Sequence, residues 1–270
     1  PDLPWRASRQ VEAPAVYVVI PTYNEGGNLP PLAAALFDLP VPNLTLVVVD
    51  DNSPDGTGEI AEVLGQRYAG RVHTIHRPGK QGLGAAYRHG FRHALQEGAD
   101  FVVQMDADFS HSPDYIPQFL QYTNAYDIIV GSRFVDGSGL DPSWSWSRKL
   151  LTRWANSVYV RMILNLQQHD ATAGFKLWSR RALSAVLAYP VHSGGFVFQV
   201  EMAYLAEILG FRTLEVPIYF EDRHEGASKM SGAIQLEAAW RTLYLRWQYR
   251  RLRGGAQPTQ YKTAPDSPKE

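Results

Sequence analysis

Two aspartates, Asp106 and Asp108, leave a short apolar run as an Asp-x-Asp pair in the segment MDADFSHSP. Carboxylates this close repel one another, so the pair needs a cation or a proton nearby. A hard divalent ion such as Mg²⁺ or Mn²⁺ takes oxygen ligands and shares them with substrate phosphates. A helix cap would explain Ser110 or Ser112, but not both acids. The pattern therefore favours a metal site on Asp106 and Asp108.

A second acidic segment, DDNSPDG, begins at Asp50 and Asp51. A carboxylate at the end of a strand can accept hydrogen bonds from a ribose hydroxyl or a base N–H. The residue types that follow also suit a plain turn, and Asp55 and Gly56 are interpreted as turn residues. We predict that one of Asp50 and Asp51 contacts a nucleotide.

No G-x-G-x-x-G pattern follows the first apolar run, and there is no Walker lysine. A shorter Gly82-Leu83-Gly84 segment occurs later. It either lets the backbone approach a nucleotide or simply starts a helix, and both interpretations remain open. The histidines form no metal-ligand spacing and are interpreted as structural or solvent-facing; the ones considered are His76, His89, His93, His111 and His169.

The elements that would position these residues alternate regularly along the first half of the chain. Short, continuous, β-branched apolar runs predict buried strands at 16–20, 44–50, 72–75, 101–106 and 127–132. Helices are expected at 28–38, 57–69, 84–97 and 114–122. This alternation predicts an α/β fold with a mostly parallel central sheet and helices on both faces. Ligands bind such sheets at the carboxyl ends of the strands, where the acidic segments fall.

Composition sets outer bounds on function. The chain has 270 residues, 45% of them hydrophobic, and a formal net charge of -1, which argues against a general nucleic-acid binder. The absence of cysteine excludes disulfides, zinc-thiolate sites and thiol nucleophiles. No apolar run approaches the ~20 residues that cross a bilayer, and no signal-peptide pattern is present. We therefore expect a protein that is soluble or lies on a membrane surface.

Several motifs together resemble a known family. PTYNE (21–25), VVVDDNSPDGT (47–57), GLGAAY (82–87) and MDADFSH (105–111) resemble the inverting glycosyltransferases of family 2, which have the GT-A fold. Four later motifs resemble the polyprenol- and dolichol-phosphate mannose synthases of that family: GSRF (131–134), SRKLLTRWAN (147–156), DATAGFKLW (170–178) and VPIYFEDRHEGASKMS (216–231). The resemblance covers about residues 15–232, which we expect to form the catalytic domain.

The resemblance implies metal-dependent transfer of mannose from GDP-mannose to a polyprenyl or dolichyl monophosphate, with inversion and release of GDP. It assigns catalytic roles to Asp106, Asp108, Arg133 and Arg223. The implied nucleotide-binding residues are Pro21, Tyr23, Glu25, Asp50, Asp51, Gly84, Asp106 and Ala107. The implied ligands of Mg²⁺ or Mn²⁺ are Asp106 and Asp108, with Ser110 where some relatives have a glutamine. The implied acceptor-phosphate residues are Arg133, Arg148, Arg223, Ser228 and Lys229.

Three further polar residues are open to two interpretations each. Asp170 could bond a sugar hydroxyl or pin its own loop. Gln199 and Glu201 lie in GGFVFQVEMAYLAEILG, which predicts a buried helix. A carboxylate there is costly unless paired, so a sugar hydroxyl or an internal salt bridge would explain it.

Alternative functions also remain open. The same fold could use UDP-glucose with a lipid phosphate, or transfer to a sugar acceptor. A more distant alternative is a non-catalytic homologue that binds nucleotide or lipid.

The segment 233–253 predicts an amphipathic helix. Its apolar side chains, on one face, are Leu236, Trp240, Leu243, Tyr244 and Trp247, and five arginines lie between 241 and 253. Such a helix can lie among lipid headgroups, or pack on the catalytic core with its arginines solvated. We expect a cytoplasmic protein, peripheral on the cytosolic face of a membrane, with a membrane-anchoring partner protein as a further option. Segments 1–14 and 254–270 are expected to be flexible tails.

Overall fold

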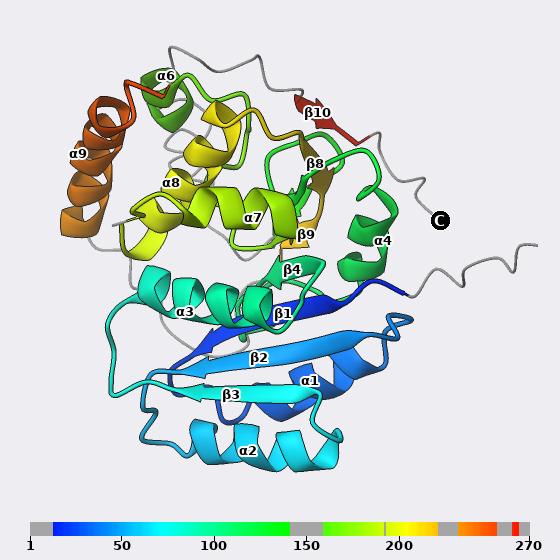
Figure 1. The fold of residues 1–270 in the computed structure, drawn as a ribbon. Helices are drawn as coiled ribbons and strands as arrows, with labels where there is room; N and C mark the ends of the chain where they lie inside the picture. The colour runs from blue at the N-terminus through cyan, green and yellow to red at the C-terminus, as the bar shows by residue number, and fades with distance from the viewer. Residues whose placement is uncertain (1–12, 141–158, 192, 221–231, 253–260, 265–270) are drawn as a thin grey trace, which may run out of the picture.

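The computed structural model describes residues 13–140, 159–191, 193–220, 232–252 and 261–264. Within them the central sheet has eight strands in the order β10-β8-β5-β7-β4-β1-β2-β3. All neighbouring strands are parallel except those next to β7, which runs antiparallel to β4 and β5. Helices cover both faces (Figure 1). The predicted α/β fold with a mostly parallel sheet is confirmed.

The first half of the chain folds as its apolar pattern predicts. The predicted strands are β1 (Val16–Thr22), β2 (Leu44–Asp50), β3 (Val72–His76), β4 (Phe101–Gln104) and β5 (Ile128–Ser132). The predicted helices are α1 (Leu29–Phe37), α2 (Thr57–Arg67), α3 (Leu83–Gln96) and α4 (Tyr115–Gln121). Their acidic and glycine-containing segments fall where expected, at the carboxyl ends of the strands.

The second half contains the two helices predicted at 194–210 and 233–253, together with elements that the sequence did not reveal. Its strands are β6 (Gly139–Leu140), β7 (Lys176–Ser179), β8 (Thr213–Pro217), β9 (Tyr219–Phe220) and β10 (Tyr261–Thr263). Its helices are α6 (Arg161–Leu164), α7 (Arg180–Leu187), α8 (Gly195–Ile208) and α9 (Gly232–Gln248). The expectation of a loose tail at 254–270 is wrong for β10, which extends the sheet by pairing with β8.

The hydrophobic core is divided between the two faces of the sheet. One cluster packs α1, α2 and α4 against side chains such as Val18 and Val48. The other packs α3, α7, α8 and α9 against the opposite side chains of the same strands, such as Val19 and Val49. Alternate strand residues thus point to opposite faces, and both are buried, which is why these strands read as continuous apolar runs.

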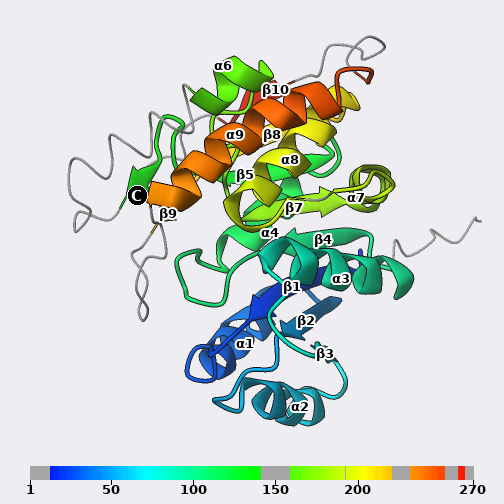
Figure 2. The same ribbon diagram turned by 90° about the vertical axis from the view of Figure 1, so that its left-hand side faces the viewer.

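Helix α9 buries one face and exposes another. Thr242, Leu245 and Tyr249 are buried against the core, and α9 packs on α8 and α6. Of the predicted apolar face, Trp240 and Trp247 instead point outward, 68% and 58% exposed, and the side chain of Leu236 lies outside the described residues. The helix therefore packs on the core, beside α8 and α6 (Figure 2), and still exposes aromatic side chains. Among the described residues, no helix is long and apolar enough to span a bilayer.

Candidate active site

The turn after β4 fixes the Asp106/Asp108 pair from within the loop. The Asp108 carboxylate accepts hydrogen bonds from the Ser110 backbone N–H at 3.1 Å and from its hydroxyl at 2.6 Å. Phe109, between them, has a φ of 59°, a left-handed conformation that is costly for a bulky residue. The turn that orients the Asp108 carboxylate is therefore strained at Phe109. Ser110 donates hydrogen bonds to this carboxylate and does not cap α4, whose N-cap is Asp114.

Tyr87 of α3 links the Asp106 carboxylate to the core. Its hydroxyl oxygen lies 2.9 Å from the Asp106 carboxylate and 2.9 Å from the Met105 carbonyl. Burial raises the pKa of Tyr87 well above its usual value, and the charges of Asp106 and then Asp108 raise it further. The charges of both acids therefore act on the buried Tyr87 hydroxyl. Within the described residues no cluster of three or more metal-binding side chains occurs. The all-oxygen pair nevertheless fits Mg²⁺ or Mn²⁺ that completes its coordination with phosphate oxygens.

Asp50 and Asp51, at the end of β2, have different partners. The Asp50 carboxylate accepts from the Thr22 hydroxyl at 3.1 Å and from the Ser53 N–H at 3.0 Å and hydroxyl at 2.5 Å, so it holds its own turn. Asp51 instead pairs with Arg77, the residue directly after β3. Burial raises the pKa of Asp51, and Arg77 only partly offsets that effect. Asp51 is therefore the member of the pair with a charged partner at the sheet edge.

The other predicted nucleotide residues surround this edge. Pro21 lies in β1, and the Tyr23 ring is covered by the Lys80 ammonium, 3.8 Å from its centre. The Glu25 side chain accepts from the Asn28 amide at 2.8 Å. Ala107, between Asp106 and Asp108 in the sequence, is buried.

Gly84 has a packing reason to lack a side chain. A Cβ there would come within 2.7 Å of the Ser193 carbonyl and 2.9 Å of the Phe198 ring. Since Gly84 lies in the first turn of α3, this supports the helix-start interpretation, and its contact with a nucleotide remains a prediction.

Arg133, directly after β5, is clamped by Asp170. Arg133 Nε and Nη2 donate to the two Asp170 oxygens at 2.8 Å each, and the Arg133 backbone N–H donates at 3.1 Å. Burial alone would lower the pKa of Arg133, but the charge and hydrogen bonds of Asp170, together with the charge of Asp106, raise it. Asp170 thus fixes the guanidinium, and Nη1 makes no hydrogen bond to the described residues.

Asp170 belongs to a buried charge cluster, defined here as Arg133, Asp170, Lys176 and Glu215. Glu215 of β8 is fully buried and accepts from the Asp170 and His169 backbone N–H groups at 2.8 Å each. Burial lowers the pKa of Lys176 to about 7, an effect that Asp170 partly offsets. Glu215 therefore fixes the loop that carries Asp170, and Asp170 in turn fixes Arg133.

Gln199 and Glu201 occupy α8, as predicted, and both are engaged inside the protein. Gln199 Oε1 accepts from the Gln104 amide at 2.7 Å and from the Lys176 ammonium at 3.3 Å. The Glu201 carboxylate accepts from the Tyr249 hydroxyl at 2.7 Å and the Ser193 N–H at 2.8 Å. Neutral donors thus satisfy Glu201, rather than the salt bridge considered from the sequence. A sugar contact of Gln199 or Glu201 remains a prediction.

Four predicted acceptor residues lie outside the described part of the chain. They are Arg148, Arg223, Ser228 and Lys229.

A doubly covered, mostly parallel sheet with an Asp-x-Asp turn at its carboxyl edge defines the GT-A class of nucleotide-sugar transferases. The chain belongs to glycosyltransferase family 2, because the model of "Glycosyl transferase family 2" matches residues 17–187. It is therefore a glycosyltransferase.

Two relatives cover nearly the whole chain. An undecaprenyl-phosphate mannosyltransferase of Micrococcus luteus is 43% identical over 244 residues, which is 89% of this chain and 99% of the relative. A polyprenol monophosphomannose synthase of Mycolicibacterium smegmatis is 42% identical over 225 residues, 83% of this chain and 84% of the relative.

A solved mannosyltransferase of Pyrobaculum calidifontis, in complex with GDP-Man and Mn²⁺, shares the fold. Its TM-score is 0.56 at 15% identity, over 90% of this chain and 73% of that one. Glucosyl-3-phosphoglycerate synthase of Mycobacterium tuberculosis also shares the fold. Its TM-score is 0.57 at 16% sequence identity, over 87% of this chain and 80% of that one.

Sequence reasoning missed several residues of this site. Arg77 directly follows a predicted strand, a position at which the carboxyl-edge rule could have found it. Lys176 and Glu215 are charges inside otherwise apolar strand segments, and such charges are rarely buried without a partner. Tyr87 gave no signal, because an aromatic residue on a helix usually belongs to the core.

Proposed function

We propose that this glycosyltransferase transfers mannose from GDP-mannose to a polyprenyl monophosphate, with inversion and with the help of Mg²⁺ or Mn²⁺. The observation that carries the proposal is the position of Arg133, fixed by Asp170 and close enough to Asp106 for that charge to raise its pKa. An anion-binding guanidinium beside a metal-binding carboxylate would bring an anionic acceptor to a metal-bound diphosphate.

The relatives support the choice of substrates. Two of them, more than 40% identical, are named for mannosyl transfer involving undecaprenyl phosphate and polyprenol. GDP-Man and Mn²⁺ are bound by a protein of the same fold. These names favour mannose and a lipid phosphate over UDP-glucose or a sugar acceptor.

On the donor side, Asp106 and Asp108 would hold the metal ion, which when bound offsets the charge on the departing diphosphate. Ala107, between them, would line the diphosphate site. Asp51 would accept from the ribose or the base, while Asp50 holds the turn. Pro21, Tyr23 and Glu25 would complete the nucleotide contacts.

On the acceptor side, Arg133 would hold the phosphate through Nη1. Arg148, Arg223, Ser228 and Lys229 are assigned to the same phosphate by the family motifs alone. An oxygen of this phosphate forms a bond to the anomeric carbon of mannose while the bond from that carbon to GDP breaks. GDP leaves with the electron pair. A phosphate monoester has a second pKa of about 6, so it needs no general base near neutral pH.

The exposed face of α9 offers a way to reach a lipid acceptor. Trp240, Leu243, Tyr244 and Trp247 are all exposed. Aromatic side chains next to arginines suit the headgroup region of a bilayer. We therefore place the enzyme peripherally on the cytosolic face of a membrane. A membrane-anchoring partner protein is the alternative device.

The test is transfer of labelled mannose from GDP-mannose to short-chain polyprenyl phosphate, with Mg²⁺ or Mn²⁺ and then with chelator. UDP-glucose and a neutral polyprenol serve as matched donor and acceptor controls. Metal-dependent product from GDP-mannose and the phosphate alone is the expected result. Product only from UDP-glucose would overturn the donor assignment. Equal product from the neutral polyprenol would overturn the role of Arg133.

A further inference from the structure

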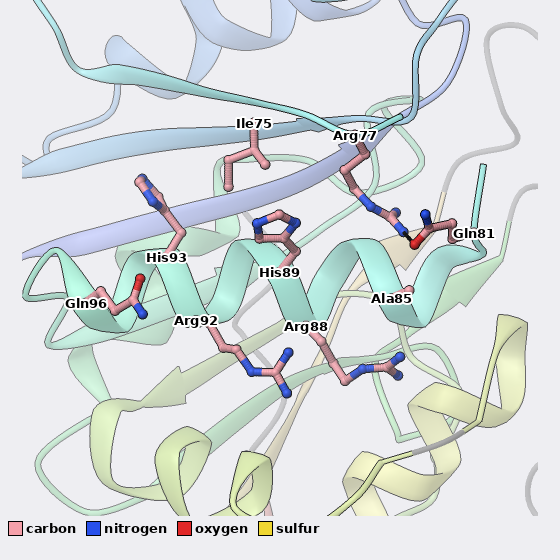
Figure 3. A pocket seen from close by; sticks show the side chains of 9 residues that line it. All are labelled: Ile75, Arg77, Gln81, Ala85, Arg88, His89, Arg92, His93 and Gln96. Carbon is pink, nitrogen blue, oxygen red and sulfur yellow. Dashed lines mark hydrogen bonds between the residues drawn. The ribbon is translucent and has the colours of Figure 1, made fainter. Parts of the chain in front are cut away.

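A cavity of about 510 Å³ lies along the outer face of α3, between that helix and the end of β3. Figure 3 shows its lining side chains along successive turns of α3, with Arg77 and Gln81 at one end. Three arginines and two histidines line it, and none of its lining residues is Asp or Glu. We call this cavity the α3 groove.

Arg88 and Arg92 line the groove without an ion-pair partner among the described residues. Neither makes a hydrogen bond or an ion pair with another described residue, and Arg88 Nη1 is shielded from solvent. Like charges four residues apart on a helix destabilise it. Burial and the charge of Arg92 lower the pKa of Arg88, against a smaller opposing effect of Glu201. The Glu201 carboxylate is itself bonded to Tyr249 and Ser193.

The other basic side chains of the groove bring no acid to Arg88 or Arg92. Arg77 is tied to Asp51 and Gln81. His93 Nε2 lies 2.9 Å from His73 Nδ1, and His89 is exposed. Burial lowers the pKa of His93, and the charge of His73 lowers it further. A concave surface on which two guanidinium groups lack an acidic partner is stabilised when an anion enters it.

We propose that the α3 groove is a second anion site of this protein, which binds a phosphate-bearing ligand between Arg88 and Arg92. Side chains one helical turn apart have Cβ atoms about 5–6 Å from each other, so two guanidinium groups can grip one phosphate. The site uses neither Asp106 nor Asp108 and requires no metal. Neither the donor nor the acceptor assigned above accounts for it.

The phosphate has two possible sources with the same chemistry. Helix α8 packs on both α3 and α9, and α3 and α9 both lie on the face turned toward the viewer in Figure 2. A phospholipid headgroup is one source, because α9 exposes its aromatic side chains. A soluble phosphate or diphosphate is the other.

The test compares two charge-matched double variants of the full chain in chelator, which removes metal-dependent diphosphate binding. Arg88→Gln/Arg92→Gln removes the proposed ligands. Arg67→Gln/Arg71→Gln removes two exposed arginines at the other end of β3, beside α2. One arm titrates inorganic pyrophosphate calorimetrically. The other measures sedimentation with phosphatidylcholine vesicles, with and without phosphatidylglycerol.

We expect the first variant to lose about tenfold or more in affinity for one of the probes, because hydrogen bonds between charged groups are the strong ones. The second variant should stay within about twofold of the wild type, by the same scale. Loss in the pyrophosphate arm identifies a soluble ligand, and loss only with phosphatidylglycerol identifies a headgroup. The proposal would be overturned if Arg88→Gln/Arg92→Gln bound both probes with the affinity of the wild type. It would also be overturned if Arg67→Gln/Arg71→Gln lost as much affinity as Arg88→Gln/Arg92→Gln.

Thermal unfolding separates binding from folding. Without ligand, the Arg88→Gln/Arg92→Gln variant should melt at or above the wild-type temperature, since a repulsion is removed. Pyrophosphate or anionic vesicles, whichever binds, should raise the melting temperature of the wild type and not that of the variant. If the double variant fails to fold, Arg92→Gln alone, at an exposed position, must still weaken binding or the proposal is wrong.

Discussion

The acidic turns after β2 and β4 and the buried charge cluster, which we assign to the same active site, are held in opposite ways. In the turns, most donors to Asp50 and Asp108 are neutral groups two or three residues away, and the Thr22 hydroxyl is a further neutral donor to Asp50. In the cluster, Arg133 is held by an acid 37 residues away, which is fixed by another 45 residues further on. The turns are thus local structures, whereas the cluster exists only in the complete fold.

This difference predicts separate consequences of mutation. A local turn can lose a carboxylate and keep its shape, because its backbone donors stay in place. A buried ion pair that loses one partner leaves a charge in a poorly solvated site, at a cost of several kcal/mol. Changes in the turns should therefore act on catalysis, and changes in the cluster on catalysis and stability together.

The largest effect is expected for Asp106→Asn. Transfer activity should fall by about 10³-fold or more, because electrostatic stabilisation of the leaving group is lost. Stability in chelator should be equal or higher, since a repulsion is relieved. Labelled sugar transfer and thermal unfolding measure the two quantities. Asp114→Asn, at an exposed acid of the same loop, is the control. A variant that loses stability as well as activity would show that the turn needs the Asp106 carboxylate for its shape.

Asp170→Asn should be the most destabilising change of the set. It leaves Arg133 buried without its counter-charge, at a cost of about 3–5 kcal/mol in the free energy of unfolding. Urea unfolding measures this cost. Arg181→Gln, which breaks the ion pair of a 70% exposed arginine with Asp127, should cost less than about 1 kcal/mol. If both variants cost the same, the cluster is not held by its buried charges.

The remaining activity of Asp170→Asn tests whether Asp170 positions Arg133 as well as stabilising the fold. With Arg133 free to move, the KM for the acceptor phosphate should rise more than the KM for the donor. An equal rise in both would mean that Asp170 supports the fold alone.

Lys176→Met tests the cluster through pH. The pKa of Lys176 is about 7 in the folded protein and near 10.5 in an exposed lysine. Between these values the unfolded chain binds more protons, so this group makes stability rise with pH, by up to about 1.4 kcal/mol per unit. Below pH 7 the cost of burying the charge is largest.

The free energy of unfolding of Lys176→Met should therefore exceed that of the wild type most at pH 7, and by progressively less toward pH 9. Urea unfolding at pH 7, 8 and 9 measures the difference. Lys262→Met, at an exposed lysine, should leave the pH dependence unchanged. A constant difference between Lys176→Met and wild type would show that the amine is not buried as a titrating group.

The same contrast explains how much could be predicted from the sequence. Asp106, Asp108, Asp50 and Asp51 sit in turns whose residue types announce them, after strands with a clear apolar pattern. Strand β7 was missed because it is only four residues long and begins with Lys176, a charged residue that is nevertheless 1% exposed. Chemistry that depends on neighbouring residues can be predicted from a short window of sequence. Partners that meet across the sheet cannot be predicted in this way.

Asp170 shows the limit most clearly. Its sequence position allowed either a sugar contact or a pin for its loop. The structure shows that its carboxylate is taken up by Arg133 and by the Thr172 hydroxyl, 3.3 Å away. Only the pairing of β5 with β7 and β8 brings these residues together. No spacing rule relates residue 133 to residue 170.

The smallest effect is expected for Ser53→Ala, which tests whether the turn after β2 is held by local hydrogen bonds. The Ser53 hydroxyl donates to Asp50 at 2.5 Å and accepts from the Asn24 N–H at 3.0 Å. Its loss should cost about 1 kcal/mol, because the Ser53 N–H and Thr22 still hold Asp50. The KM for the donor should rise only a few-fold, by about the same free energy. Urea unfolding and donor titration measure both, with Ser112→Ala as a control in the other acidic turn. A loss as large as that of Asp170→Asn would mean that the turns, too, depend on a single buried partner.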